Sequence, residues 1–75
     1  MRLEDALWQD PERMSGAVCF RDTRIPVSVL FDYLVGDGLE EFYAGYPDVR
    51  PEQVKSVLDT SLTRVEELVR TKIAA

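Results

Sequence analysis

The sequence lacks histidine altogether and contains a single cysteine, Cys19, among its 75 residues. Without histidine, the usual zinc and haem ligand sets cannot form, and neither can serine–histidine or cysteine–histidine nucleophile pairs. A single cysteine excludes an intrachain disulfide and fits a reducing, cytoplasmic location. We therefore expect a binding or regulatory module that is not an enzyme. We expect no cofactor, no metal and no small-molecule substrate.

Long apolar runs and an excess of basic charge are also missing. No apolar stretch is long enough to span a membrane, and Glu4 and Asp5 argue against a signal peptide. The chain carries 14 acidic and 9 basic residues, a net charge of −5. Residues 1–48 hold four arginines against ten acids, a balance of −6, whereas residues 49–75 hold five basic residues against four acids, a balance of +1. Only the C-terminal third could approach phosphate without repulsion.

The length predicts one domain over residues 1–75. A chain this short buries only about 60% of the surface that its unfolded form exposes, so its core is marginal. Small domains often compensate with disulfides, a metal or a partner chain. Because the composition excludes the first two remedies, we expect the chain to form a homodimer.

Turn residues divide the chain into a short β arm and a three-helix unit, which predicts a mainly α fold. Residues 1–25 form the arm and its turns, with a short strand or arm at 3–9 and a strand at 17–20. Gly16 is expected to adopt a conformation that other residues resist. Residues 26–73 form the three-helix unit.

Proline and glycine set the limits of the three helices. Pro26 stands in the first turn of the first helix, which stops at Gly36-Asp37-Gly38, where both glycines are expected to supply left-handed angles. A short second helix covers residues 39–44. Pro51 opens a third helix that runs to about residue 72 and spans roughly 33 Å.

Apolar residues recur along the whole third helix, although the first two helices can cover only its first half. Beyond about Leu62 little of the chain is left to pack on it, so a partner is expected to cover this part. In the alternative, the N-terminal arm folds back over it. The residues predicted to bind a partner are Arg24, Leu62, Val65 and Val69, and those predicted to form a dimer arm are Val18, Cys19 and Phe20.

A helix, a short helix, a tight turn and a longer helix follow one another as in helix-turn-helix proteins. In DNA-binding members of that class, the start of the last helix contacts bases. The residues predicted to contact DNA are therefore Arg50, Gln53, Lys55 and Ser56. A solvated helix face explains the basic residues equally well.

Several motifs resemble the bacterial Domain of Unknown Function 433 family. They are Asp10-Pro11, Met14-Ser15-Gly16, the run Phe20-Arg21-Asp22-Thr23-Arg24-Ile25-Pro26-Val27, the run Leu30-Phe31-Asp32-Tyr33-Leu34 with its glycine-rich break and Leu39-Glu40-Glu41-Phe42, and Tyr46-Pro47-Asp48-Val49 with Glu52-Gln53-Val54. Together they cover about residues 10 to 60.

The resemblance implies a homeodomain-like three-helix fold with a short N-terminal β arm, commonly dimeric. It also implies the antitoxin half of a two-gene toxin–antitoxin module whose usual partner is a PIN-domain ribonuclease. It brings no catalytic residues. Operator DNA is a second possible partner. The alternatives are a helix-turn-helix DNA-binding protein without a toxin partner and a structural self-association module.

The chain departs from the family pattern at two positions. Asp22 stands where the family usually has glycine, and aspartate tolerates a positive φ better than most residues but less well than glycine. Arg50 stands where a serine or threonine would cap the third helix. Either Asp48 supplies the missing acceptor, or Arg50 is kept to bind an anion.

Arg24 has two interpretations. In the functional one, its guanidinium contacts a partner's carboxylates or phosphate, and in an acidic nuclease site it would block the metal ligands. In the structural one, it forms an ion pair with Asp10 or Asp32 that ties the arm to the first helix.

Overall fold

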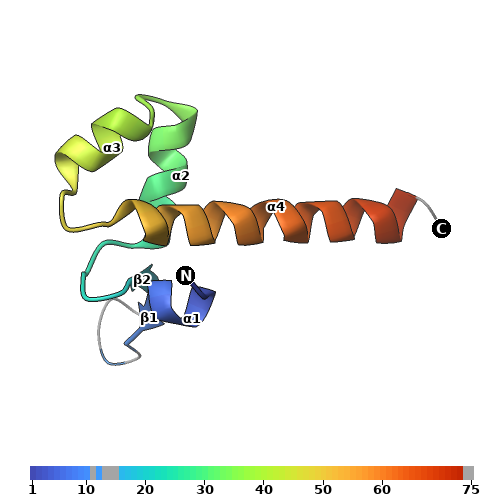
Figure 1. Cartoon of the computed structure of the whole chain (residues 1–75), viewed down its shortest axis with the longest axis horizontal. Helices are drawn as coiled ribbons and strands as arrows, with labels where there is room; N and C mark the ends of the chain where they lie inside the picture. Colours follow the sequence, from blue (N-terminus) through green and yellow to red (C-terminus); the bar gives the residue numbers. More distant parts are fainter. Residues whose placement is uncertain (11, 13–15, 74–75) are drawn as a thin grey trace.

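A two-stranded antiparallel sheet and four helices make up the part of the chain that the computed structural model describes, residues 1–10, 12 and 16–73. In chain order the elements are α1 (Leu3–Ala6), β1 (Leu7–Gln9), β2 (Val18–Phe20), α2 (Val27–Val35), α3 (Leu39–Gly45) and α4 (Pro51–Ile73) (Figure 1). The mainly α prediction is confirmed, and the predicted strand at 17–20 is present as β2. Pro11, Met14 and Ser15 of the predicted turn motifs lie outside the described residues.

The N-terminal segment differs from the prediction of a strand or arm at residues 3–9. Leu3–Ala6 form one helical turn, and only Leu7–Gln9 are extended. The acids Glu4 and Asp5 stand in this first turn, where they complement the positive helix end. Residue Ala6 is fully buried and ends the turn, and β1 then pairs with β2 so that Leu7 lies opposite Phe20.

The three longer helices follow the predicted limits closely. Pro26 is the N-cap of α2, with φ −61°, and a proline there costs no intrahelical hydrogen bond. Of the two glycines after α2, only Gly38 has a positive φ, +94°, whereas Gly36 has φ −106°. The prediction that both are left-handed is therefore half right. Gly16 adopts φ +76°, as predicted.

The core lies where α2, α3 and the first turns of α4 meet β2. Phe42 is fully buried at its centre, and its ring lies 5.3 to 6.0 Å from four other aromatic rings. Leu30 and Val57 join α2 and α4 in the same cluster. The buried apolar residues of this core are Phe20, Leu30, Phe42, Val49, Val54 and Val57.

Helix α4 leaves this core and projects far beyond it (Figure 1). The radius of gyration is 13.8 Å, whereas a compact chain of this length would have about 11 Å. We call residues 62–73 the outer half of α4. No helix in the described part of the chain has the length and apolar content needed to cross a bilayer.

Candidate functional site

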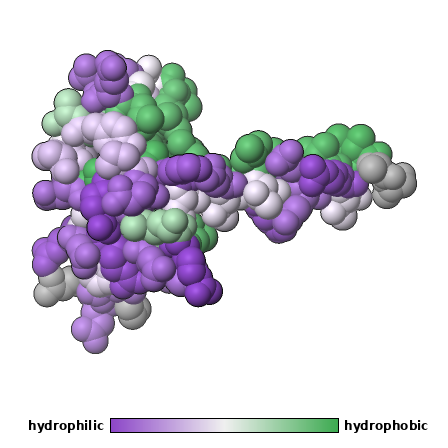
Figure 2. Space-filling model, in the orientation of Figure 1, coloured by the Kyte–Doolittle hydropathy of each residue, from purple (hydrophilic) through white to green (hydrophobic). Residues whose placement is uncertain are grey.

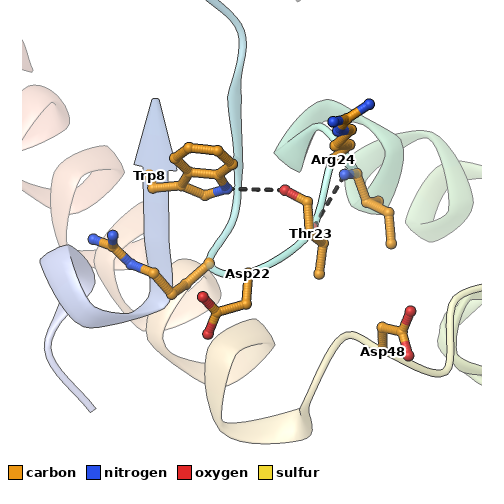
Figure 3. A pocket seen from close by; sticks show the side chains of 7 residues that line it. Trp8, Asp22, Thr23, Arg24 and Asp48 are labelled. Atoms are coloured by element: carbon orange, nitrogen blue, oxygen red, sulfur yellow. Dashed lines mark hydrogen bonds between the residues drawn. The ribbon is translucent and has the colours of Figure 1, made fainter. Parts of the chain in front are cut away.

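The turn between β2 and α2 carries the Thr23-Arg24-Ile25-Pro26 motif and is held by Thr23. The Thr23 hydroxyl donates a hydrogen bond to the Phe20 carbonyl at 2.8 Å and accepts one from the Ile25 N–H at 3.1 Å. The Trp8 indole N–H donates to the Thr23 carbonyl at 2.9 Å, which ties the turn to β1 (Figure 3). Thr23 is therefore a turn residue, and three hydrogen bonds hold the turn in place.

Asp22 occupies the left-handed region in this turn, with φ +66°. A positive φ is the backbone conformation that favours the glycine expected here from the family resemblance. Aspartate can adopt this angle at some cost, because its short polar side chain tolerates it better than a branched one.

The two arginines of the turn have different environments. The Arg21 guanidinium donates hydrogen bonds to the carbonyls of Glu4 and Leu7, at 2.7 and 2.9 Å. Arg24 is exposed, and among the described residues it forms no ion pair. The predicted ion pair with Asp10 or Asp32 is therefore wrong. Arg21 instead joins the end of β2 to α1 and β1, all within residues 1–25.

An open hollow of about 640 Å³ borders this turn. Figure 3 shows the Arg24 side chain turned away from the carboxylates of Asp22 and Asp48. Its guanidinium therefore keeps its five donors available for an acidic group of another molecule. The residues that line the hollow are Trp8, Arg21, Asp22, Thr23, Arg24, Ile25 and Asp48.

The start of α4 does not present the four predicted DNA-contacting side chains together. Gln53 is fully buried and Ser56 is 8% exposed, so neither can reach a base. Arg50 and Lys55 are exposed, but each lies near an acid: Arg50 is 3.9 Å from Glu52, and Lys55 is 2.6 Å from Asp59. The prediction is thus wrong for Gln53 and Ser56. It remains geometrically possible for the two basic residues.

Gln53 supplies one half of a cap at the start of α4. Its Oε1 accepts a hydrogen bond from the Arg50 N–H at 2.8 Å, which is the return half of a capping box. Its Nε2 donates to the carbonyls of Ala6 and Arg21, both at 3.2 Å. The Gln53 N–H, which an N-cap hydroxyl would accept in a full box, donates to the Arg50 carbonyl at 3.0 Å, so its acceptor is neither Asp48 nor an anion. Sequence reasoning could have found Gln53 from its place three residues after the N-cap.

The predicted dimer arm is mostly buried within the chain. Only Val18 is accessible, at 39%, whereas Cys19 and Phe20 are 3% and 0% exposed. The side chains of Cys19 and Phe20 therefore cannot form a dimer contact, because they complete the chain's own packing. Burial raises the pKa of the Cys19 thiol.

The outer half of α4 is exposed, as predicted. Leu62, Val65 and Val69 are 60%, 57% and 48% accessible. The N-terminal segment packs on α4 near Gln53, through the bond to Ala6, and not on the outer half. The alternative that the arm covers these three residues is wrong for the described part of the chain.

These observations define a small, mainly helical protein with an arginine-bearing turn and an exposed apolar helix end. Residues 8–59 match the family described as Protein of unknown function (DUF433). Because the match spans more than half of the 75 residues, the chain belongs to this family. No curated protein and no solved structure gives a significant match.

Proposed function

We propose that this protein is an antitoxin-like regulatory module that binds a PIN-like ribonuclease as its toxin partner. The observation that carries the proposal is Arg24, an exposed arginine on a hydrogen-bonded turn, which forms no ion pair with another described residue. An arginine in this state loses no internal contact when it binds a carboxylate. We further propose that the chain acts as a homodimer in the cytoplasm.

We infer that α2, α3 and α4 form the homeodomain-like unit that the family resemblance implies. Their order and the tight connection between α3 and α4 agree with that fold. In this arrangement the turn before α2 stands at the end of the three-helix unit, clear of the projecting outer half of α4 (Figure 1).

The proposed mechanism is coverage of the nuclease site and involves no reaction on this chain. A PIN-like site holds its metal ions with carboxylates, and the Arg24 guanidinium would form paired, charge-assisted hydrogen bonds with them. Such pairs are strong when water is excluded, and Trp8 and Ile25 beside the hollow supply apolar surface for that exclusion. The nuclease would then lose both metal binding and substrate access.

Growth rescue in cells tests the proposal. The PIN-like nuclease encoded next to this chain is expressed with wild-type protein, Arg24→Ala or Arg64→Ala. Arg64 is a matched control, because it is an exposed arginine on α4. We expect wild type and Arg64→Ala to restore growth. We expect Arg24→Ala to restore at least tenfold less growth. Absence of such a nuclease, or equal rescue by Arg24→Ala, would overturn the proposal.

Operator DNA is the second candidate, and the exposed basic residues at the start of α4 favour it. Arg50 and Lys55 could contact phosphate once their neighbouring acids release them. A titration with DNA from upstream of the gene, at two salt concentrations, tests this function, because phosphate contacts strengthen as salt falls. The absence of DNA binding at low salt would exclude this function.

A further inference from the structure

Two exposed apolar surfaces meet in the corner between α2 and the outer half of α4. Phe31 and Leu34 on α2 are 38% and 40% exposed. Figure 2 shows apolar surface on the side of the globular part that faces the projecting helix, and again along the same side of that helix. Two exposed apolar surfaces of this kind, each bordered by polar residues, are unusual on a monomer. The apolar surface on α4 consists of Leu62, Val65, Val69 and Ile73.

The projecting helix adds surface comparable in size to one side of a dimer interface. The chain exposes 5459 Å², whereas a compact monomer of 8.6 kDa exposes about 4,700 Å². The excess of roughly 750 Å² is close to the ~800 Å² that each partner buries in an interface of standard size. One partner of this chain's own dimensions is enough to cover it.

The charges on α4 favour an antiparallel arrangement with a second copy. Glu66 and Glu67 lie in the middle of the outer half, and Arg70 and Lys72 lie at its end. A parallel pair would align all like charges. An antiparallel pair that joins Leu62 of one copy to Val69 of the other places Glu66 of both copies near the two-fold axis. It also brings Arg70 of one copy, on the same flank of the contact, about two residues from Asp59 of the other.

The same alignment fills the corner. It brings Ile73 of one copy level with Leu58 of the other, and Leu58 packs against the core cluster that joins α4 to α2. The end of each α4 then abuts the exposed face of α2 in the other copy. The contact is reciprocal, as a two-fold dimer requires.

We propose that the corner is occupied by a second copy of this chain, with the two α4 helices antiparallel and each helix end seated against the partner's α2. This deepens the homodimer of the proposed function and rests on that part of it. It does not depend on a toxin.

Sedimentation of the purified chain over micromolar to millimolar concentrations tests the dimer. Val65→Glu places a charge at the centre of the proposed contact, and Thr63→Glu places the same charge on an exposed position of the other face of α4. We expect Val65→Glu to weaken dimerisation at least tenfold and Thr63→Glu to change it less than twofold. Both positions are exposed in the single chain, so both variants are expected to fold. A wild-type monomer throughout, or equal effects of the two variants, would overturn the proposal.

Disulfide trapping tests the geometry. Leu34→Cys and Ile73→Cys variants are mixed and oxidised, and Val18→Cys replaces Leu34→Cys as the control, because Val18 is also exposed but belongs to β2. We expect a disulfide between Leu34→Cys and Ile73→Cys chains and at least tenfold less with the control. Predominant crosslinking of Ile73→Cys to itself would indicate parallel helices and overturn the arrangement. Because no nuclease is present, failure here leaves the Arg24 proposal untouched.

Discussion

The side chain of Gln53 caps the backbone of Arg50: its Oε1 accepts the Arg50 N–H at 2.8 Å. A capping box has two such bonds, and the other would run from the N-cap side chain to the N–H of Gln53. Arginine has no acceptor atom to complete it. Helix α4 therefore begins with half of a capping box.

Arg50→Ser is expected to complete the box. The Gln53 N–H now donates to the Arg50 carbonyl at 3.0 Å, and the serine hydroxyl offers it a second acceptor. We expect this to stabilise the fold by up to about 1 kcal/mol and to raise the melting temperature by up to roughly 4–8 °C. Thermal unfolding measures this, with Arg64→Ser in the middle of α4 as the control, where serine is expected to lower stability slightly. An unchanged or lower melting temperature for Arg50→Ser would contradict the expectation.

Gln53→Ala is expected to destabilise the fold. The substitution removes the bond to Arg50 and leaves the carbonyls of Ala6 and Arg21 without their Gln53 donor. Losing buried hydrogen bonds in this way costs about 1–3 kcal/mol. Urea unfolding is the measurement, and a loss well below 1 kcal/mol would show that these bonds contribute little.

Asp22→Gly is expected to stabilise the turn that carries Arg24. Glycine adopts the φ of +66° without strain, although it also gives the unfolded chain more freedom. We expect a net gain of about 0.5 kcal/mol, since a left-handed L-residue costs roughly 1–2 kcal/mol. Asp37→Gly is the matched control, because Asp37 is not among the positive-φ residues. It is expected to lose stability, and a loss in both variants would contradict the assignment of strain to Asp22.

The sequence predicts the helices well because their signals are local. Apolar spacing and the positions of Pro26, Pro51 and Gly38 set the limits of α2 and α4 to within a residue or two. The single turn at Leu3–Ala6 is too short to show a helical period, so it was predicted as extended. Its helical form depends on packing of Ala6 against α4, which no local pattern records.

The candidate site is less predictable, because a polar residue can be either a surface ligand or a buried support. Gln53 and Ser56 were predicted to contact DNA but lie on the buried face with Val57. Gln53 lies three residues before Ser56 and four before Val57, and this helical spacing is the available signal. No sequence pattern distinguishes the roles of Arg21 and Arg24, because their contacts depend on where α1 and β1 pack against the rest of the chain.

Stability is expected to fall at alkaline pH through Tyr33. The neighbouring Tyr46 raises the pKa of Tyr33 above its ordinary value, with further contributions from burial, a hydrogen bond to Tyr46 and the carboxylates of Asp37 and Glu41. A folded pKa above the unfolded one favours the neutral phenol in the fold. The resulting stability is fully present below the ordinary tyrosine pKa and is lost as pH rises through the folded pKa.

Urea midpoints measured from pH 8 to 11 test this expectation. The midpoint of wild type should fall over the upper part of the range, and Tyr33→Phe should show a shallower fall because that phenol no longer titrates. Equal slopes for the two proteins would contradict it. Tyr43→Phe is a second comparison, because burial and Glu52 also raise the pKa of Tyr43.

Arg21→Ala and Arg24→Ala are expected to separate stability from partner binding. Arg21 donates to the exposed carbonyl of Glu4 and the half-buried carbonyl of Leu7, so its loss should cost about 1 kcal/mol. Arg24 forms no ion pair with another described residue, and its loss should change the free energy of unfolding by less than about 0.5 kcal/mol. Urea unfolding of both variants gives the comparison. A large loss in Arg24→Ala would mean that Arg24 supports the turn, and any loss of nuclease neutralisation by that variant would then reflect folding.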